Sequence, residues 1–155
     1  MAKPPVIEDK QIEHLLKATA AYSRVPLRDT ALILTLYGTA LLDSSDMALC
    51  DIRDRDALLR IFQAHQPDVV FHAAALKHLP MLEQYPLEGW KTNTLGTLNV
   101  LRAAETYGAT RFVNISTDKA ADASSVLGQT KRLAERLTAW YAQEYGLAYL
   151  SVRFG

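Results

Sequence analysis

The chain has 155 residues, 49% of them hydrophobic and 22% charged, which is typical of one globular domain with a single core. Its 17 basic and 17 acidic side chains balance, so we expect no nucleic-acid partner. The single cysteine, Cys50, excludes an intrachain disulfide and a cysteine-based zinc site, and we expect no metal. No apolar run approaches the ~20 residues that cross a bilayer, so we expect a cytoplasmic protein without a membrane partner.

The first 50 residues predict two helices and no strand. Apolar residues lie on one helical face over about residues 8–22. Pro26 interrupts this pattern, and residues 29–42 form a second apolar stretch of helical length. We therefore expect residues 1–50 to form a helical segment.

From Asp51 onward, helices alternate with short apolar strands. The pattern predicts strands at residues 68–72, 111–115 and 148–152, and helices at about 54–66, 92–107 and 124–145. Such alternation is typical of right-handed crossover units. We expect an α/β fold, a partial Rossmann-like parallel sheet of about three strands with flanking helices, preceded by the two N-terminal helices.

One strand end concentrates reactive side chains. The predicted strand 111–115 leads into Ser116, Thr117, Asp118 and Lys119, and Lys131 follows on the next predicted helix. Ligands bind at the carboxyl ends of strands in open parallel sheets, which makes this a candidate site. The hydroxyls and the carboxylate could instead form a simple helix-capping turn.

Five segments follow one another in the chain: Asp51–Asp54, Phe71–His78, Asn93–Thr97, Ser116–Ala120 and Gly128–Arg132. Together and in this order they resemble the extended short-chain dehydrogenases/reductases, and among them the polysaccharide-biosynthesis UDP-N-acetylglucosamine 4,6-dehydratases. The resemblance implies that residues 51–155 form part of an NAD(P)-binding Rossmann domain.

The resemblance implies a nicotinamide cofactor, NAD or NADP, and a nucleotide-sugar substrate of the UDP-N-acetylglucosamine class. Asp51 and Ile52 match positions at the adenine, Asn93 matches an architectural residue, and Lys131 matches the lysine that holds the nicotinamide ribose and lowers the pKa of its neighbours. The small residues after the strand 68–72 would let the backbone approach the cofactor. The residues implied at the cofactor are Asp51, Ile52, Ala73, Ala74, Ala75, Lys77, Asn93, Ser116 and Lys131.

The implied reaction is that of a lyase, in which the sugar is oxidised at C4, loses the C5 proton and the C6 hydroxyl, and regains the hydride at C6. In the matching positions Asp118 is the acid for the C6 hydroxyl, Lys119 the C5 base and Thr117 a hydrogen-bonding partner of the substrate, with Lys131 completing the catalytic set. Lys119 must then lose its proton near neutral pH, which we expect burial and the charge of Lys131 to favour.

The sequence departs from the family in three ways. Most members carry a tyrosine four residues before the active-site lysine, where this chain has Leu127; a branch of the dehydratases carries methionine there. The family also opens with a strand and a G-x-G-x-x-G turn, but no two of the seven glycines are spaced G-x-G. The family continues beyond the position of Gly155. These departures predict a partial domain.

Residues 1–50 contain the segments Asp9–Ile12, Arg28–Leu32 and Leu36–Ala40. Through these segments they resemble the start of the catalytic domain of tyrosine recombinases, although the usual active-site arginine and His-x-x-Arg box are missing. We therefore expect two segments of different origin, joined near Cys50. Two other functions stay open. The chain could be a non-catalytic remnant or self-associating module, a homo-oligomer held by sheet edges. It could also be a DNA-binding integrase fragment, which the neutral charge disfavours.

Overall fold

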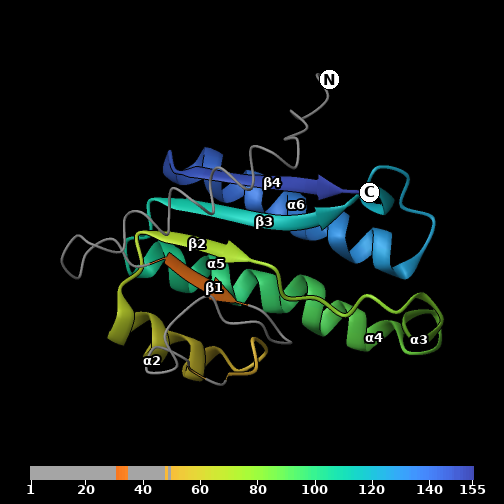
Figure 1. The fold of residues 1–155 in the computed structure, drawn as a ribbon, viewed down its shortest axis with the longest axis horizontal. Helices are drawn as coiled ribbons and strands as arrows, with labels where there is room; N and C mark the ends of the chain where they lie inside the picture. Colours follow the sequence, from red (N-terminus) through yellow and green to blue (C-terminus); the bar gives the residue numbers. More distant parts are fainter. Residues whose placement is uncertain (1–30, 35–47, 49) are drawn as a thin grey trace.

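A computed structural model describes residues 31–34, 48 and 50–155. Within these ranges one parallel sheet has the strand order β1-β2-β3-β4 (Figure 1). The strands are β1 (Ala31–Leu34), β2 (Val69–His72), β3 (Arg111–Thr117) and β4 (Ala148–Phe154). The predicted α/β fold with a parallel sheet and flanking helices is confirmed, as are the three predicted strands.

β1 corrects the prediction for residues 29–42, because Ala31–Leu34 pairs in parallel with Val69–His72 and is not helical. A short apolar run fits a buried strand as well as a buried helix, so periodicity alone does not separate the two. Pairing with the edge of β2 decides the outcome. The described sheet therefore has four strands where we expected about three, and the helix predicted over residues 8–22 lies outside the described residues.

The helices follow the predicted alternation, with more subdivision. They are α2 (Arg55–His65), α3 (Leu79–Gln84), α4 (Pro86–Gly89), the π-helix η2 (Trp90–Gly96), α5 (Thr97–Thr106), the short 3-10 helix η3 (Asp118–Ala120) and α6 (Val126–Tyr145). The Asp54 carboxylate caps α2 by accepting the Ala57 N–H at 2.9 Å. α6 ends at Gly146, which has a φ of 65°. Figure 1 shows α5 and α6 side by side behind the sheet.

The core lies between the sheet and these helices. Along β3, Phe112, Asn114 and Ser116 are buried and alternate with half-buried Val113 and Ile115. This period of two is what a strand with helices on one face produces. The largest fully buried side chains of the core cluster are Phe62, Phe112, Leu58, Leu101, Val70 and Val100, from β2, β3, α2 and α5.

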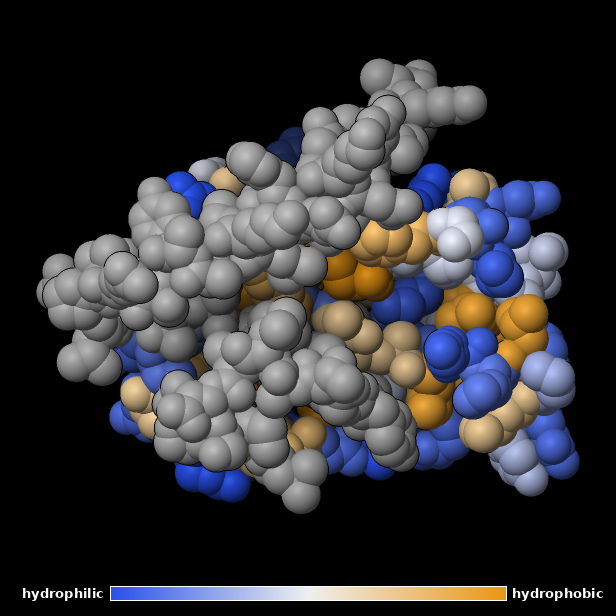
Figure 2. Space-filling model, viewed as in Figure 1, coloured by the Kyte–Doolittle hydropathy of each residue, from blue (hydrophilic) through white to orange (hydrophobic). Residues whose placement is uncertain are grey.

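Several apolar side chains stay exposed at the end of the molecule where α3 and α4 lie. They include Leu79, Met81 and Leu87. Figure 2 shows orange patches among polar residues at the right of the view, the end at which Figure 1 labels α3 and α4. Among the helices that the structure describes, none is long and apolar enough to cross a membrane.

Candidate functional site

The carboxyl ends of β2, β3 and β4 lie at one edge of the sheet, because all three strands are parallel. The segment Ala73–Ala75 leaves β2 at this edge, and Asp118 and Lys119 follow β3 there. Lys131 reaches the same edge from α6, through a hydrogen bond to the end of β3. The structure therefore brings together the predicted residues of the strand ends and of α6.

Lys131 is the most buried of these charged residues, with 7% of its surface exposed. Its Nζ donates a hydrogen bond to the Ile115 carbonyl at 2.8 Å. Burial lowers the pKa of Lys131 to about 8, while the negative charge of Glu135 acts in the opposite direction. Lys131 is thus a buried cation whose proton is easier to remove than that of an exposed lysine.

Thr117, Asp118 and Lys119 form a cluster of contacts at the end of β3. Thr117 Oγ1 donates to Asp118 Oδ1 at 2.9 Å, and Lys119 Nζ donates to the same oxygen at 3.1 Å. The hydrogen bond from Thr117, and then that from Lys119, holds the pKa of Asp118 below its usual value. The side chains of Asp118 and Lys119 are 57% and 46% exposed. Our expectation that Lys119 is buried is therefore wrong, since its side chain is exposed and paired with Asp118.

α6 begins close against this cluster. Ser125 caps the helix by accepting the Gly128 N–H at 3.1 Å. A Cβ at position 128 would collide with the backbone carbonyl of Lys119. Glycine at this position lets α6 pack directly on η3. Lys131 lies about one helical turn after Gly128 and therefore reaches the carboxyl end of β3.

Asn93 joins the segment after β2 to α6. Its Oδ1 accepts the Leu76 N–H at 2.8 Å, and its Nδ2 donates to the Leu76 carbonyl at 3.0 Å and to Thr130 Oγ1 at 3.1 Å. Asn93 lies in the π-helix η2, a wider helical turn that often occurs at functional sites. These contacts are of the kind that the predicted architectural role requires, and the role itself stays a prediction.

The alanines after β2 differ in exposure. Ala74 is buried, Ala75 is half-buried and Ala73 is exposed, while Lys77 lies further along on the surface. A surface lined by small side chains allows close approach of a planar or extended ligand. The predicted contact of this segment with a cofactor stays open.

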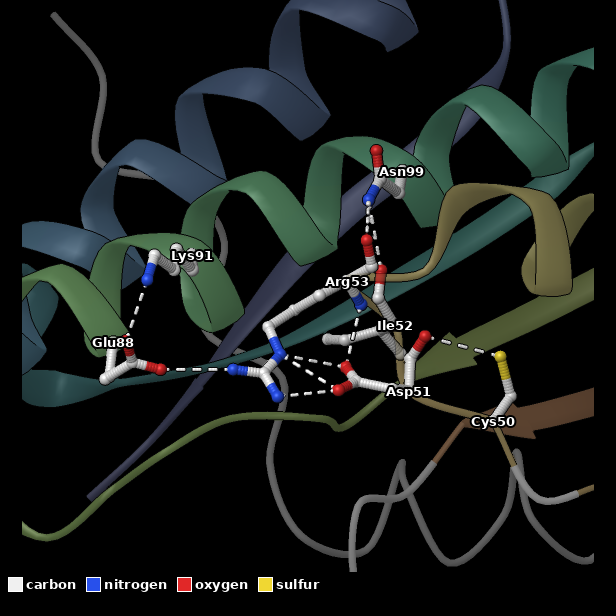
Figure 3. A network of polar contacts seen from close by, with 7 residues as sticks. All are labelled: Cys50, Asp51, Ile52, Arg53, Glu88, Lys91 and Asn99. Carbon is white, nitrogen blue, oxygen red and sulfur yellow. Dashed lines mark hydrogen bonds and ion pairs between the residues drawn. The ribbon is translucent and has the colours of Figure 1, made fainter.

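Asp51 lies in a chain of ion pairs that Figure 3 shows. Its carboxylate accepts the Arg53 backbone N–H at 2.9 Å and the Arg53 Nη2 at 2.7 Å, and these bonds lower the pKa of Asp51. Arg53 also contacts Glu88 at 3.1 Å, and Glu88 contacts Lys91 at 2.9 Å. The predicted adenine residue Asp51 is therefore exposed, ionised and held in place by Arg53.

Ile52 faces the opposite way, into the fold. Its side chain is buried against Gly96 of η2, where a Cβ would come within 2.6 Å of Ile52 Cδ1. Its carbonyl accepts a hydrogen bond from Asn99 Nδ2 at 3.1 Å (Figure 3). The predicted contact of Ile52 with an adenine stays a prediction.

Ser116 also faces the helix layer. Its hydroxyl donates to Glu135 Oε1 at 2.5 Å, and Arg153 of β4 binds the same carboxylate. Neither Glu135 nor Arg153 is among the site residues predicted from the sequence. The spacing of four residues between Lys131 and Glu135 places them on one helical face, and was the available signal.

Comparison with known proteins gives a family match. The family model described as "Polysaccharide biosynthesis protein" matches residues 31–155, so the similarity includes β1 and begins before Asp51. The probable polysaccharide biosynthesis protein EpsC of Bacillus subtilis is 41% identical over 107 residues, which are 69% of this chain and 18% of EpsC. The chain spans 18% to 32% of the length of the first curated relatives that it matches.

Two solved structures share the fold. The UDP-glucose 4-epimerase of Thermotoga maritima with UDP-glucose matches with a TM-score of 0.71 and 25% identity, over 90% of this chain and 50% of that chain. The UDP-glucose 4-epimerase of Thermus thermophilus in complex with NAD matches with a TM-score of 0.69 and 24% identity, over 92% of this chain and 50% of that one. The expected integrase-like segment lies mostly outside the described residues, and its division from the rest near Cys50 stays a prediction.

Proposed function

Because the chain belongs to the polysaccharide biosynthesis protein family of extended short-chain dehydrogenases/reductases, we propose that residues 51–155 form part of a nucleotide-sugar 4,6-dehydratase site. The cluster of Thr117, Asp118 and Lys119 at the end of β3, next to buried Lys131, carries this proposal. The proposed substrate belongs to the UDP-N-acetylglucosamine class. The UDP-glucose in the Thermotoga maritima structure supports a UDP-sugar.

The proposed cofactor is NAD or NADP, and the NAD in the Thermus thermophilus structure supports it. The described residues offer a fitting donor set, with the exposed Asp51 carboxylate for an amino group, the small side chains of Ala73–Ala75 for close approach, and the Lys131 ammonium for ribose hydroxyls. The described residues do not include a glycine turn for the pyrophosphate. When bound, the cofactor would take up and return the hydride.

The Asp118–Lys119 ion pair suggests how the proton steps are divided. The reaction needs a neutral amine to remove the C5 proton and a protonated carboxyl to release the C6 hydroxyl as water. Transfer of one proton from the Lys119 ammonium to the Asp118 carboxylate produces both forms at once. A sugar that covers this exposed pair and excludes water would favour the neutral forms.

Leu127 removes the phenol that usually accepts the C4 hydroxyl proton. Its side chain is buried one helical turn before Lys131, so the position contributes packing only. The Thr117 hydroxyl, which donates to Asp118, belongs to the same cluster and offers a polar group to the sugar. We assign Thr117 as a hydrogen-bonding partner of the substrate in this chain.

The test is dehydratase turnover by the full chain with UDP-N-acetylglucosamine and either NAD or NADP in deuterated water. Proton NMR follows the appearance of the C6 methyl group and the uptake of deuterium at C5. Asp118→Asn and Lys119→Met should abolish both signals, whereas Asp122→Asn, which changes an exposed carboxylate in the next turn, should leave them unchanged. Equal turnover in all four proteins would refute the assignment.

A second candidate is a non-catalytic module that self-associates. Within the described sheet β1 and β4 each pair with only one neighbour, and free strand edges invite pairing with another copy. A chain that forms concentration-dependent oligomers in sedimentation velocity, and whose unfolding midpoint does not respond to NAD or NADP, would favour this candidate.

A further inference from the structure

Glu135 lies one helical turn after Lys131 on α6 and is bound from two strands. Its Oε1 accepts hydrogen bonds from Ser116 Oγ at 2.5 Å and from Arg153 Nε at 2.8 Å, and its Oε2 accepts from Arg153 Nη2 at 2.6 Å. The side chains of Glu135 and Arg153 are 13% and 30% exposed. Two parallel bonds from a guanidinium and one from a hydroxyl satisfy this carboxylate and fix its position.

The two strand residues that bind Glu135 are direct neighbours in the sheet. Ser116 and Arg153 are partners in the parallel register of β3 and β4, so both side chains lie on the α6 face. Ile115, immediately before Ser116, accepts the hydrogen bond from Lys131. Two consecutive residues of β3 are thus held by a lysine and a glutamate one turn apart on α6, directly before the Thr117–Lys119 cluster.

We propose that Glu135 is a positioning residue for Lys131: through Ser116 and Arg153 it holds the ends of β3 and β4 against α6, and its carboxylate serves as a counter-charge to the lysine. This inference rests on the proposed function for the role of Lys131 as the cofactor-site lysine. It goes further by naming the carboxylate that fixes the position of Lys131 and acts as its counter-charge.

The electrostatic part follows from opposing effects on one ammonium. Burial lowers the pKa of Lys131 to about 8, and the carboxylate of Glu135 raises it. Arg153 neutralises part of that carboxylate, so it opposes Glu135. His72 of β2 carries no charge at neutral pH, because burial and the charge of Lys131 lower its pKa to about 3. Glu135 therefore increases the protonated fraction of Lys131.

The other charged groups around α6 are paired or distributed over several elements. Asp118 and Lys119 of η3 pair with each other at 3.1 Å, and Arg132 and Arg136 of α6 are exposed. The charged side chains on the remaining helices packed against α6 are Glu83 of α3, Glu88 of α4, Lys91 of η2, and Arg102 and Glu105 of α5. None of these changes between the variants below, so a difference in titration reports Glu135.

The test uses the full chain without cofactor or substrate. NMR of the chain labelled with ¹³C- and ¹⁵N-lysine gives the titration midpoint of Lys131, whose signal is assigned by its loss in Lys131→Met. We expect a wild-type midpoint near 8, which falls by about half a pH unit or more in Glu135→Gln because the opposing charge is gone. Glu144→Gln, at an exposed position of the same helix, should leave the midpoint unchanged.

Arg153→Met should shift the titration midpoint of Lys131 in the opposite direction. It removes the cation that neutralises Glu135, so the Lys131 midpoint should rise, and this variant decides the question if Glu135→Gln does not fold. A Glu135→Gln chain that is less stable but titrates like the wild type would show a structural role alone and overturn the proposal. So would an Arg153→Met midpoint that falls or does not move. A chain that binds no NAD or NADP can still pass this test, so the inference and the proposed function can fail separately.

Discussion

Asn93 hydrogen bonds to both backbone groups of Leu76, accepting from the N–H at 2.8 Å and donating to the carbonyl at 3.0 Å. The same amide donates to Thr130 on α6, so one side chain holds the segment after β2, the π-helix and α6 together. The bonds are local to the proposed cofactor site and partly or fully buried. Loss of these hydrogen bonds should lower the stability of the whole domain.

We predict that Asn93→Ala lowers the free energy of unfolding by about 3 kcal/mol, because buried backbone groups of Leu76 lose their partners. Urea denaturation followed by circular dichroism measures this. Gln143→Ala, an amide at an exposed position of α6, should cost less than about 0.5 kcal/mol. Equal midpoints for the two variants would contradict a structural role for Asn93.

We predict that Lys131→Met stabilises the chain at pH 7 by about 2 kcal/mol. The pKa of Lys131 is about 8 in the folded state and about 10.4 in the unfolded state, so the folded protein holds a proton at a cost of about 3 kcal/mol. The lost bond to the Ile115 carbonyl offsets part of the gain. The same change should weaken NAD or NADP binding, as measured by calorimetry.

The pH dependence gives an independent check on Lys131. Between pH 8 and about 10.4 the unfolded state binds more protons than the folded state, so wild-type stability should rise with pH in this window. Lys131→Met should lack that rise, whereas Lys91→Met, which changes an exposed lysine, should retain it. Parallel wild-type and Lys131→Met curves would contradict the buried charge.

We predict that acid destabilises the chain through His72. Burial, and then Lys131, lowers the pKa of His72 to about 3 in the folded state, against about 6.5 when unfolded. The stability present above pH 6.5 is therefore lost as the pH falls toward 3, by about 2 kcal/mol at pH 5. Urea titrations at pH 7 and 5 should show this loss in the wild type and in His78→Gln, which changes an exposed histidine, and a smaller loss in His72→Gln.

We predict that Gly128→Ala is more harmful than Gly96→Ala. At position 128 the new methyl group meets the backbone carbonyl of Lys119, which cannot yield without moving η3. At position 96 it meets the flexible side chain of Ile52. Both variants gain helix propensity of about 1 kcal/mol, so the propensity term cancels between them. A Gly128→Ala chain as stable as Gly96→Ala, with unchanged amide shifts over residues 117–120, would contradict the close contact.

The sequence predicted those parts of the fold that depend on local pattern. β2, β3 and β4 were identified because each short apolar run is bounded by a helix and a proline, glycine or polar turn. β1 was not, since Ala31–Leu34 is extended only by virtue of pairing with β2, a partner more than thirty residues away. The π-helical form of η2 was also not predicted, because a π-helix and an α-helix place apolar residues at similar spacings in the sequence.

The candidate site shows the same division. The cluster after β3 and Lys131 could be identified from residue types around one strand end. The hydrogen bonds of Glu135 could not be identified in this way, because they join α6, β3 and β4. The spacing of residues in the sequence does not show which strands become neighbours. The wrong expectation about Lys119 has the same origin, since exposure depends on how the turn after β3 points.

The position of β1 has a consequence for changes of sequence at this strand. β1 lies at the margin of the described sheet and is held by β2 alone, through the four-residue register Ala31–Leu34 with Val69–His72. Any sequence that supplies four extended residues beside β2 can form this strand without a change in the connections between the other strands. Exchange of the sequence at Ala31–Leu34 would therefore change the strand at this margin of the described sheet while leaving β2 to β4, α6 and the residues that they carry in place.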